Sequence, residues 1–184
     1  METERLILRR FTMEDAEKCF EYFGQDKVIG RYIPMFPVCS MSAMEEMVRG
    51  FCNNSNVWLI EEKCTGIPMG YVSVDIPYEV LGIGEIAYLL GEKFWHKGYA
   101  QEAVRRIIQY LFDEKELYMI EAKVNESNIA SKILLQKLNF KQDGILRQRR
   151  IDFMLRERNN LIVYSILKEE YKIDKSYENK LNRS

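Results

Sequence analysis

Alternating polar and apolar residues predict a first strand at residues 5–9, and further runs of strand character follow along the chain. Glycine or proline separates the runs in the middle of the sequence, so antiparallel pairing in a meander is the simplest arrangement there. The predicted strands cover residues 5–9, 57–62, 68–76, 84–90, 119–124, 144–150 and 161–169.

Helical patterns lie between these strands. Ser42 stands three residues before Glu45, which is the spacing of a capping box at a helix start. Further along, apolar residues recur at the i, i+3 and i+4 positions of one buried helix face. The predicted helices begin at Thr12 and Ser42 and, later in the chain, cover residues 98–113 and 128–138.

The order of the predicted elements is β-α-α-β-β-β-α-β-α-β-β, which is typical of an α+β domain with a mixed sheet. The sequence contains no internal repeat and no low-complexity linker. We therefore expect a single domain over residues 1–171, followed by a polar C-terminal tail at residues 172–184.

Composition narrows the class of protein. Hydrophobic residues make up 47% and charged residues 30% of the chain, as in folded globular proteins. The net charge of -1 provides no basic field that would attract nucleic acid. The N-terminus lacks a signal-peptide segment and no apolar run is long enough to span a membrane, which favours a cytoplasmic protein. The four cysteines form no CxxC pair, so we expect no metal site.

The stretch "WHKGYA", residues 95–100, lies between a predicted strand and a long helix. Gly98 permits a tight turn there, and the small side chain of Ala100 lets a ligand approach the backbone. Unpaired amides at a helix start favour an anion such as phosphate. A purely structural glycine turn is the alternative. The P-loop and dinucleotide-binding motifs are both absent from the sequence.

This stretch resembles the Q/R-x-x-G-x-G/A pyrophosphate loop of the GNAT superfamily of acetyl-CoA-dependent N-acetyltransferases. Gly98 and Ala100 match its fixed positions, while Trp95 departs from the usual first residue, as is common in the RimJ/RimL-like branch. Residues 125–140 resemble a second motif of that branch, with Asn125, Asn128 and Ser131 at the marked positions. Similarity to the branch extends over residues 3–171, with the usual Glu, Gly and Asp replaced by Gln136, Asn139 and Asn160.

The resemblance implies a three-layer fold whose splayed sheet holds acetyl-CoA between the strands at 84–90 and 119–124. Main-chain groups of residues 87–90 would bind the pantetheine arm, and the amides of residues 96–101 would bind the pyrophosphate. The residues implied in cofactor binding are Ala87, Tyr88, Leu89, Leu90, Trp95, His96, Lys97, Gly98, Tyr99, Ala100, Gln101, Asn125, Asn128 and Ser131. His96, the only histidine, occupies a variable position of the motif, so we expect its backbone N–H rather than its ring to matter.

Acetyl transfer requires a neutral amine and a proton for the departing thiolate. The strand glutamate that serves as base in part of the family corresponds to Glu85, with an exposed or salt-bridged glutamate as the alternative. The tyrosine that usually serves as acid is replaced by Leu135, which leaves Ser131 as the candidate acid. A serine that only contacts coenzyme A is the alternative. An α-amine acceptor needs little deprotonation and is favoured if no strong base is present.

In this family the loop at residues 30–37 and the first two helices frame the acceptor pocket, which implies roles for Tyr32, Met35 and Phe36. Packing against the core is the alternative for these residues. An arginine cluster at residues 147–158 favours either contact with an acidic surface or, more simply, a solvated hairpin. The leading hypothesis is an N-acetyltransferase acting on a protein N-terminal α-amine or a small amine, as a monomer or homodimer. A catalytically weak acyl-CoA-binding sensor is the alternative.

Overall fold

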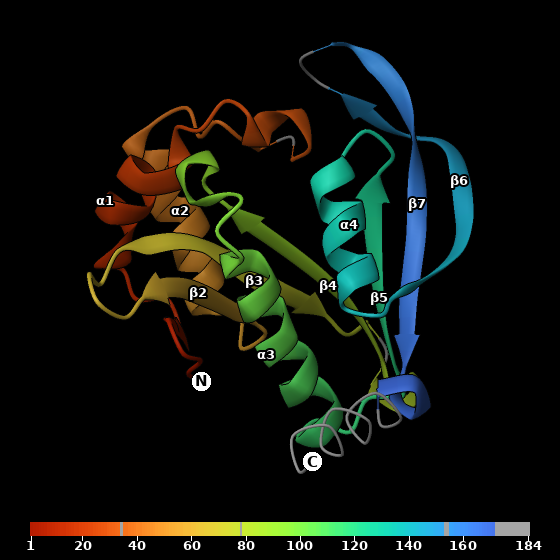
Figure 1. Cartoon of the computed structure of the whole chain (residues 1–184). Coiled ribbons are helices and arrows are strands. Elements are labelled where there is room, and N and C mark those ends of the chain that lie inside the picture. Colours follow the sequence, from red (N-terminus) through yellow and green to blue (C-terminus); the bar gives the residue numbers. More distant parts are fainter. Residues whose placement is uncertain (34, 78, 153–154, 172–184) are drawn as a thin grey trace.

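The computed structural model describes residues 1–33, 35–77, 79–152 and 155–171 (Figure 1). One seven-stranded sheet with the order β1-β2-β3-β4-β5-β7-β6 forms the centre of the fold. The predicted tail at residues 172–184 lies outside the described residues. The strands are β1 (Leu6–Arg9), β2 (Val57–Glu62), β3 (Pro68–Asp75), β4 (Ile83–Leu90), β5 (Met119–Asn125), β6 (Lys141–Asp152) and β7 (Glu157–Leu167).

The sheet is mixed, as predicted, because β4 and β5 are parallel while all other neighbouring strands are antiparallel. The predicted meander corresponds to β2, β3 and β4. β4 and β5 pair only along residues 83–85 and 119–121. Beyond Glu85 the two strands diverge, which splays the sheet (Figure 1).

Helices cover both faces of the sheet (Figure 1). Residues of β2 alternate between two buried clusters: Val57 and Leu59 pack with α1 and α2, whereas Trp58 and Ile60 pack with α3 and α4. Burial on both faces explains why the first four residues of this strand, 57–60, are all apolar. The helices are α1 (Asp15–Cys19), α2 (Met41–Cys52), α3 (Tyr99–Asp113) and α4 (Ile129–Lys137), with shorter helical turns at Phe20–Gly24, Ile29–Arg31, Glu79–Leu81 and Glu92–Phe94.

Two predicted helix starts were wrong. Ser40, not Ser42, caps α2, and its side-chain oxygen accepts a hydrogen bond from the Ala43 N–H at 3.2 Å. α1 begins at Asp15 rather than Thr12, because residues 13–14 form a turn, across which the Asp15 carboxylate accepts the Thr12 N–H at 2.8 Å.

The last two strands are longer at the hairpin end than the predicted 144–150 and 161–169. Nearly every residue of β6 is exposed. Its sequence therefore lacks the alternation of apolar and polar residues that would mark where a half-buried strand begins and ends. Its register with β7 shifts between Leu146 and Arg150, where extra residues bulge out of the ladder.

Candidate active site

The divergence of β4 and β5 opens a cleft of about 410 Å³, within the usual size of a ligand pocket. β4, β5, α4 and the start of α3 contribute to its walls. We call the wall made by Trp95, His96 and residues 98–101 the turn side. The wall made by Ile29, Tyr32, Ile33 and Arg150 is called the hairpin side.

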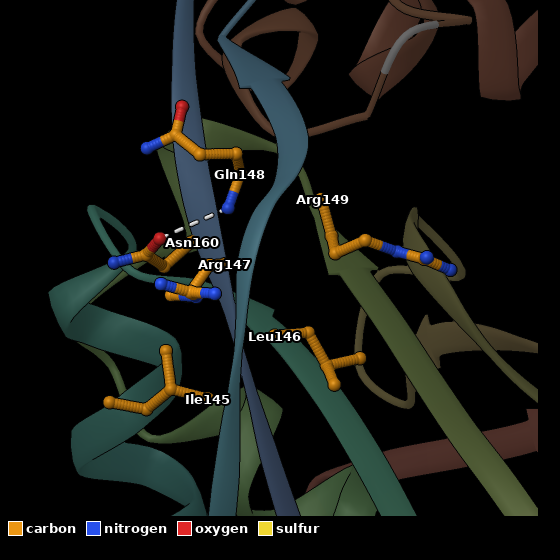
Figure 2. A pocket seen from close by; sticks show the side chains of 6 residues that line it. All are labelled: Ile145, Leu146, Arg147, Gln148, Arg149 and Asn160. Carbon is orange, nitrogen blue, oxygen red and sulfur yellow. Dashed lines mark hydrogen bonds between the residues drawn. The ribbon is translucent and has the colours of Figure 1, made fainter.

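A second hollow, of about 780 Å³, lies along the hairpin formed by β6 and β7. Figure 2 shows that its side chains do not converge, since Ile145 and Leu146 point to opposite sides of β6. The Gln148 N–H donates to Asn160 Oδ1 at 3.1 Å and holds the bulge of β6 in shape. This hollow therefore follows from the bulge, and the cleft is the better candidate for an active site.

The turn side presents unpaired amides. Gly98 caps α3 with a φ of 81°, a left-handed conformation that favours glycine. In the described structure the amides of residues 96–101 donate to no protein acceptor, and the first bond of the helix runs from the Glu102 N–H to the Gly98 carbonyl. The indole of Trp95 donates to the Leu90 carbonyl at 2.7 Å and fixes the start of the turn. These amides and the α3 dipole suit a phosphate group.

Arg5 and Glu102 brace the turn from outside the cleft. The Glu102 carboxylate accepts hydrogen bonds from Thr3 Oγ1 at 2.5 Å and from the Arg5 N–H at 2.9 Å. Arg5 also donates to the Lys97 carbonyl at 3.0 Å and lies over the Tyr99 ring. Burial raises the pKa of Glu102, but the bonds from Thr3 and Arg5 outweigh it and lower that pKa overall. The N-terminal segment thus holds the turn.

The β4 wall of the cleft has no strand partner on its β5 side. Pairing with β5 stops at Glu85, and residues 86–90 all line the cleft. On the other edge β3 approaches closely, since a Cβ at Gly70 would lie 2.0 Å from the Leu89 carbonyl oxygen. Free peptide groups along such an edge can bind an extended ligand as an added strand would.

Ser131 and Tyr88 form a hydrogen-bonded pair in the cleft, with 2.7 Å between Oγ and Oη. Asn128 caps α4, and its side-chain oxygen accepts the Ser131 N–H at 3.1 Å, which fixes the serine at the helix start. Burial raises the pKa of Tyr88 to about 12, more than the bond from Ser131 lowers it. The phenol therefore stays protonated at neutral pH, and the pair can pass a proton toward a ligand.

Asn125 ends β5 and supplies a free donor to the cleft. Its Oδ1 accepts two hydrogen bonds from Ser127, from the N–H and from Oγ, each at 3.0 Å. Its Nδ2 is buried and has no partner in the described structure. A buried donor without a partner is rare, so this group fits a carbonyl oxygen on a bound ligand.

Glu85, the predicted base, does not line the cleft itself. Its carboxylate forms an ion pair with Nζ of Lys123, which does line the cleft. Glu85 also holds the last paired position of β4, directly before the strands diverge. Glu85 is therefore connected to the cleft only through Lys123. Its salt bridge agrees with the alternative stated for this residue, an exposed or salt-bridged strand glutamate.

Two distant segments meet at the hairpin side. Arg31 Nε donates to Asp152 Oδ2 at 2.8 Å across 121 positions of sequence, and the Asp152 side chain is fully buried. This pair fixes the end of β6 against the 3-10 turn Ile29–Arg31, where Tyr32 enters the wall of the cleft. Figure 1 shows the hairpin reaching over to this turn.

Besides Glu85, three residues predicted for the site lie outside the described lining of the cleft: Lys97, Met35 and Phe36. Met35 is 56% exposed to solvent. Phe36 is buried beside Phe23, in the core shared with α1 and α2. It therefore packs against the core, which was the alternative to a role in the acceptor pocket. Every other predicted cofactor residue, and Tyr32, lines the cleft.

A family model described as "Acetyltransferase (GNAT) domain" matches residues 5–141 of this sequence. The chain belongs to the GNAT acetyltransferase family. It is 34% identical over 176 residues to the uncharacterized N-acetyltransferase p20 of Bacillus licheniformis, which covers 92% of this chain and 96% of that protein.

Solved structures of GNAT enzymes share the fold. A GNAT-family acetyltransferase from Bacillus anthracis superposes with a TM-score of 0.82 at 25% identity, over 92% of this chain and 99% of that one. The ribosomal-protein-S5-alanine acetyltransferase of Vibrio fischeri has a TM-score of 0.79 at 19% identity, over 92% and 97% of the two chains. At that lower identity the likeness concerns the fold alone.

Membership of the GNAT family confirms the predicted α+β architecture and makes the chain an acyl-CoA-dependent N-acyltransferase. Among the described residues, none of the helices has both the length and the apolar character needed to cross a membrane. In the same part of the chain, no three His, Cys, Asp or Glu side chains are grouped so that they could hold a metal ion.

Three cations in the wall of this GNAT cleft were not predicted: Lys123, Lys137 and Arg150. Lys123 is an exposed residue between the buried Ala122 and Val124 on β5. Because strand side chains alternate between two faces, the sequence could have placed the Lys123 side chain on the face opposite these two residues. Arg150 belongs to the arginine cluster and carries no sequence signal that separates it from its neighbours.

Proposed function

We propose that this GNAT enzyme transfers the acetyl group of acetyl-CoA to a primary amine, either the α-amine of a protein N-terminus or the amine of a small molecule. The cleft carries the proposal, because it joins the free amides of residues 96–101, the unpaired edge of residues 86–90 and the Ser131–Tyr88 pair. Placement in the RimJ/RimL-like branch is part of the proposal and rests on the motif residues Asn125, Asn128 and Ser131.

The residues of the cleft fit a long anionic thioester. The free amides of residues 96–101 would hold the pyrophosphate at the start of α3. Peptide groups of residues 86–90 would bind the amides of the pantetheine arm, and Asn125 Nδ2 would bind a carbonyl oxygen. Acetyl-CoA would supply an activated acyl group, and these contacts would orient it.

The acceptor amine must be neutral before it attacks. At pH 7 roughly one α-amine in six is neutral, against about one lysine-type amine in 2,500. The described lining of the cleft contains no carboxylate, and Glu85 meets the cleft only through Lys123. A site with such limited help for deprotonation favours an α-amine, with Glu85 or a water beside it as the proton acceptor.

The departing sulfur needs a proton. When the amine nitrogen attacks the thioester carbonyl directly, in a ternary complex, an N–C bond forms, the C–S bond breaks and the sulfur gains the electron pair. Ser131 would give its proton to the sulfur and recover one from Tyr88 through their 2.7 Å hydrogen bond. A phenol is protonated across the neutral pH range, and because burial raises the pKa of Tyr88 to about 12, the phenol would promptly regain a proton from solvent after the transfer.

Two assays test the proposal. Acetyl-CoA should raise the melting temperature of the purified protein, and an amine panel of peptides, polyamines and aminoglycosides should release coenzyme A thiol with at least one member. A thermal shift without thiol release from any amine would favour the sensor alternative. Absence of a shift would exclude both functions. If Glu85→Gln and Ser131→Ala both left turnover unchanged, the two catalytic assignments would be wrong.

A further inference from the structure

We propose that Arg150 makes the hairpin side of the cleft selective for an acceptor amine that carries a carboxylate. The inference rests on the proposed function, since it names the kind of amine that this function would use. Arg150 lies on β6 and is the member of the arginine cluster at 147–158 found among the described lining residues of the cleft.

Strand pairing places Arg150 near the end of the cleft where α4 begins. Asn125 ends β5 opposite Leu161, and Arg150 pairs with Asn159, two residues closer to the hairpin tip. The chain enters α4 shortly after Asn125. Lys137, another cation of the wall, ends α4 and lies about 12 Å further along its axis.

The Arg31–Asp152 pair holds this end of the cleft in place. Asp152 is two residues from Arg150, and its buried carboxylate is bonded to Arg31 at 2.8 Å. Arg31 also lies over the ring of Tyr32, with 5.8 Å from the guanidinium carbon to the ring centre. Tyr32 and Arg150 therefore face the same part of the cleft from segments far apart in sequence.

The charges around Arg150 leave its guanidinium available to a ligand. None of the described residues that line the cleft is Asp or Glu. Two carboxylates near the cleft are already paired, Asp152 with Arg31 and Glu85 with Lys123. Within the described chain no ion pair joins Arg150 to a carboxylate. A guanidinium binds a carboxylate through two parallel hydrogen bonds, so an acceptor that brings one is favoured here.

Matched acceptors test the inference. One pair is the peptide amides Ser-Asp-Ala and Ser-Asn-Ala, and the other is β-alanine and β-alaninamide, so that peptides and small amines form separate arms. We expect kcat/KM of the wild-type enzyme to favour the acid over its amide in at least one arm. Arg150→Gln should reduce that preference by about tenfold or more, and Arg150→Lys should retain part of it.

The acid-to-amide ratio is compared between enzymes, which cancels the difference in amine basicity within each pair. Arg149→Gln is the control, because Arg149 is not among the described residues that line the cleft and should leave the ratio unchanged. An equal ratio in the wild type and Arg150→Gln would overturn the inference. So would a raised KM for acetyl-CoA with an unchanged ratio, since Arg150 would then bind the phosphates of the cofactor.

The two proposals fail in distinguishable ways. If neither member of either pair nor any amine of the wider panel released thiol while acetyl-CoA still bound, the proposed function would fail. If amides were acetylated as well as their acids, the enzyme would stand as an acetyltransferase and only the selectivity assigned to Arg150 would be lost.

Discussion

The two sides of the cleft are built in different ways. The turn side uses backbone amides from one continuous segment, residues 96–101, shaped by Gly98. The hairpin side uses side chains, Tyr32 and Arg150, which are brought together by the Arg31–Asp152 pair. Under the proposed function, the cofactor would be recognised through backbone geometry that few residues specify. The acceptor would be recognised through side chains that can vary without disturbing the fold.

The largest effect is expected where the two sides meet, at Ser131. Ser131→Ala should lower kcat by about a hundredfold if the serine is the general acid, with little change in KM for acetyl-CoA. Tyr88→Phe should lower kcat less, because Ser131 would still be present to donate. Steady-state kinetics on the best amine of the panel measure both. A raised KM for acetyl-CoA with unchanged kcat would instead make Ser131 a cofactor contact.

A change on the turn side should affect the cofactor alone. A β-branched residue is strained at the left-handed conformation of Gly98, at a cost of about 1–2 kcal/mol, and it would shift the amides that face the phosphate. We expect Gly98→Val to raise KM for acetyl-CoA by about thirtyfold, which corresponds to about 2 kcal/mol, because charge-assisted bonds to the phosphate are weakened when the amides shift. Gly144→Val, where an added Cβ meets nothing within 4 Å, is the control.

A change on the hairpin side should affect the acceptor alone. Asp152→Asn keeps the shape of the buried side chain but removes the charge that Arg31 binds. We expect KM for the acceptor to rise by about tenfold, since bonds to charged groups contribute more than neutral ones, while KM for acetyl-CoA stays unchanged. Asp143→Asn, on the exposed part of β6, should change neither value. Equal changes in both KM values would show that the two sides are not separable.

The smallest effect concerns the brace behind the turn. The folded-state pKa of Glu102 is lowered, so its stabilising contribution is complete above its ordinary pKa of 4.5 and is lost as the pH falls through the folded-state value. Glu102→Gln should therefore lower the melting temperature by a few degrees at pH 7, and the gap to the wild type should close in acid. Glu17→Gln, at an exposed position of α1, should show no such pH dependence. A gap that stayed constant down to pH 3 would contradict the brace.

Much of the turn side could be predicted from the sequence, because its determinants are local. The position of Gly98 between a strand and a long amphipathic helix predicted a tight turn at the start of α3, and the structure has this turn with free amides; the anion that they would bind stays a prediction. The apolar face of α3 was likewise predicted from the spacing of its residues, and it packs in the core. In both cases the signal lies within a few residues of the structure that it specifies.

The hairpin side could not be predicted in the same way. The bond from Arg31 to Asp152 joins positions 121 residues apart, and no pattern in the sequence links them. β6 is so exposed that its extent was underestimated. Met35 and Phe36 were chosen for their size and their loop, yet burial of Phe36 in the neighbouring core removes it from the cleft. Side-chain contacts between distant segments decide this half of the site.

The division between the two sides is tested most directly by the dissociation constant of acetyl-CoA, measured by calorimetric titration without an acceptor. We expect the wild-type protein and Asp152→Asn to bind acetyl-CoA equally well, and Gly98→Val to bind it at least tenfold more weakly, because the left-handed turn would be strained. Equal binding by Gly98→Val, or equal weakening in both variants, would contradict a cofactor site built on the turn alone.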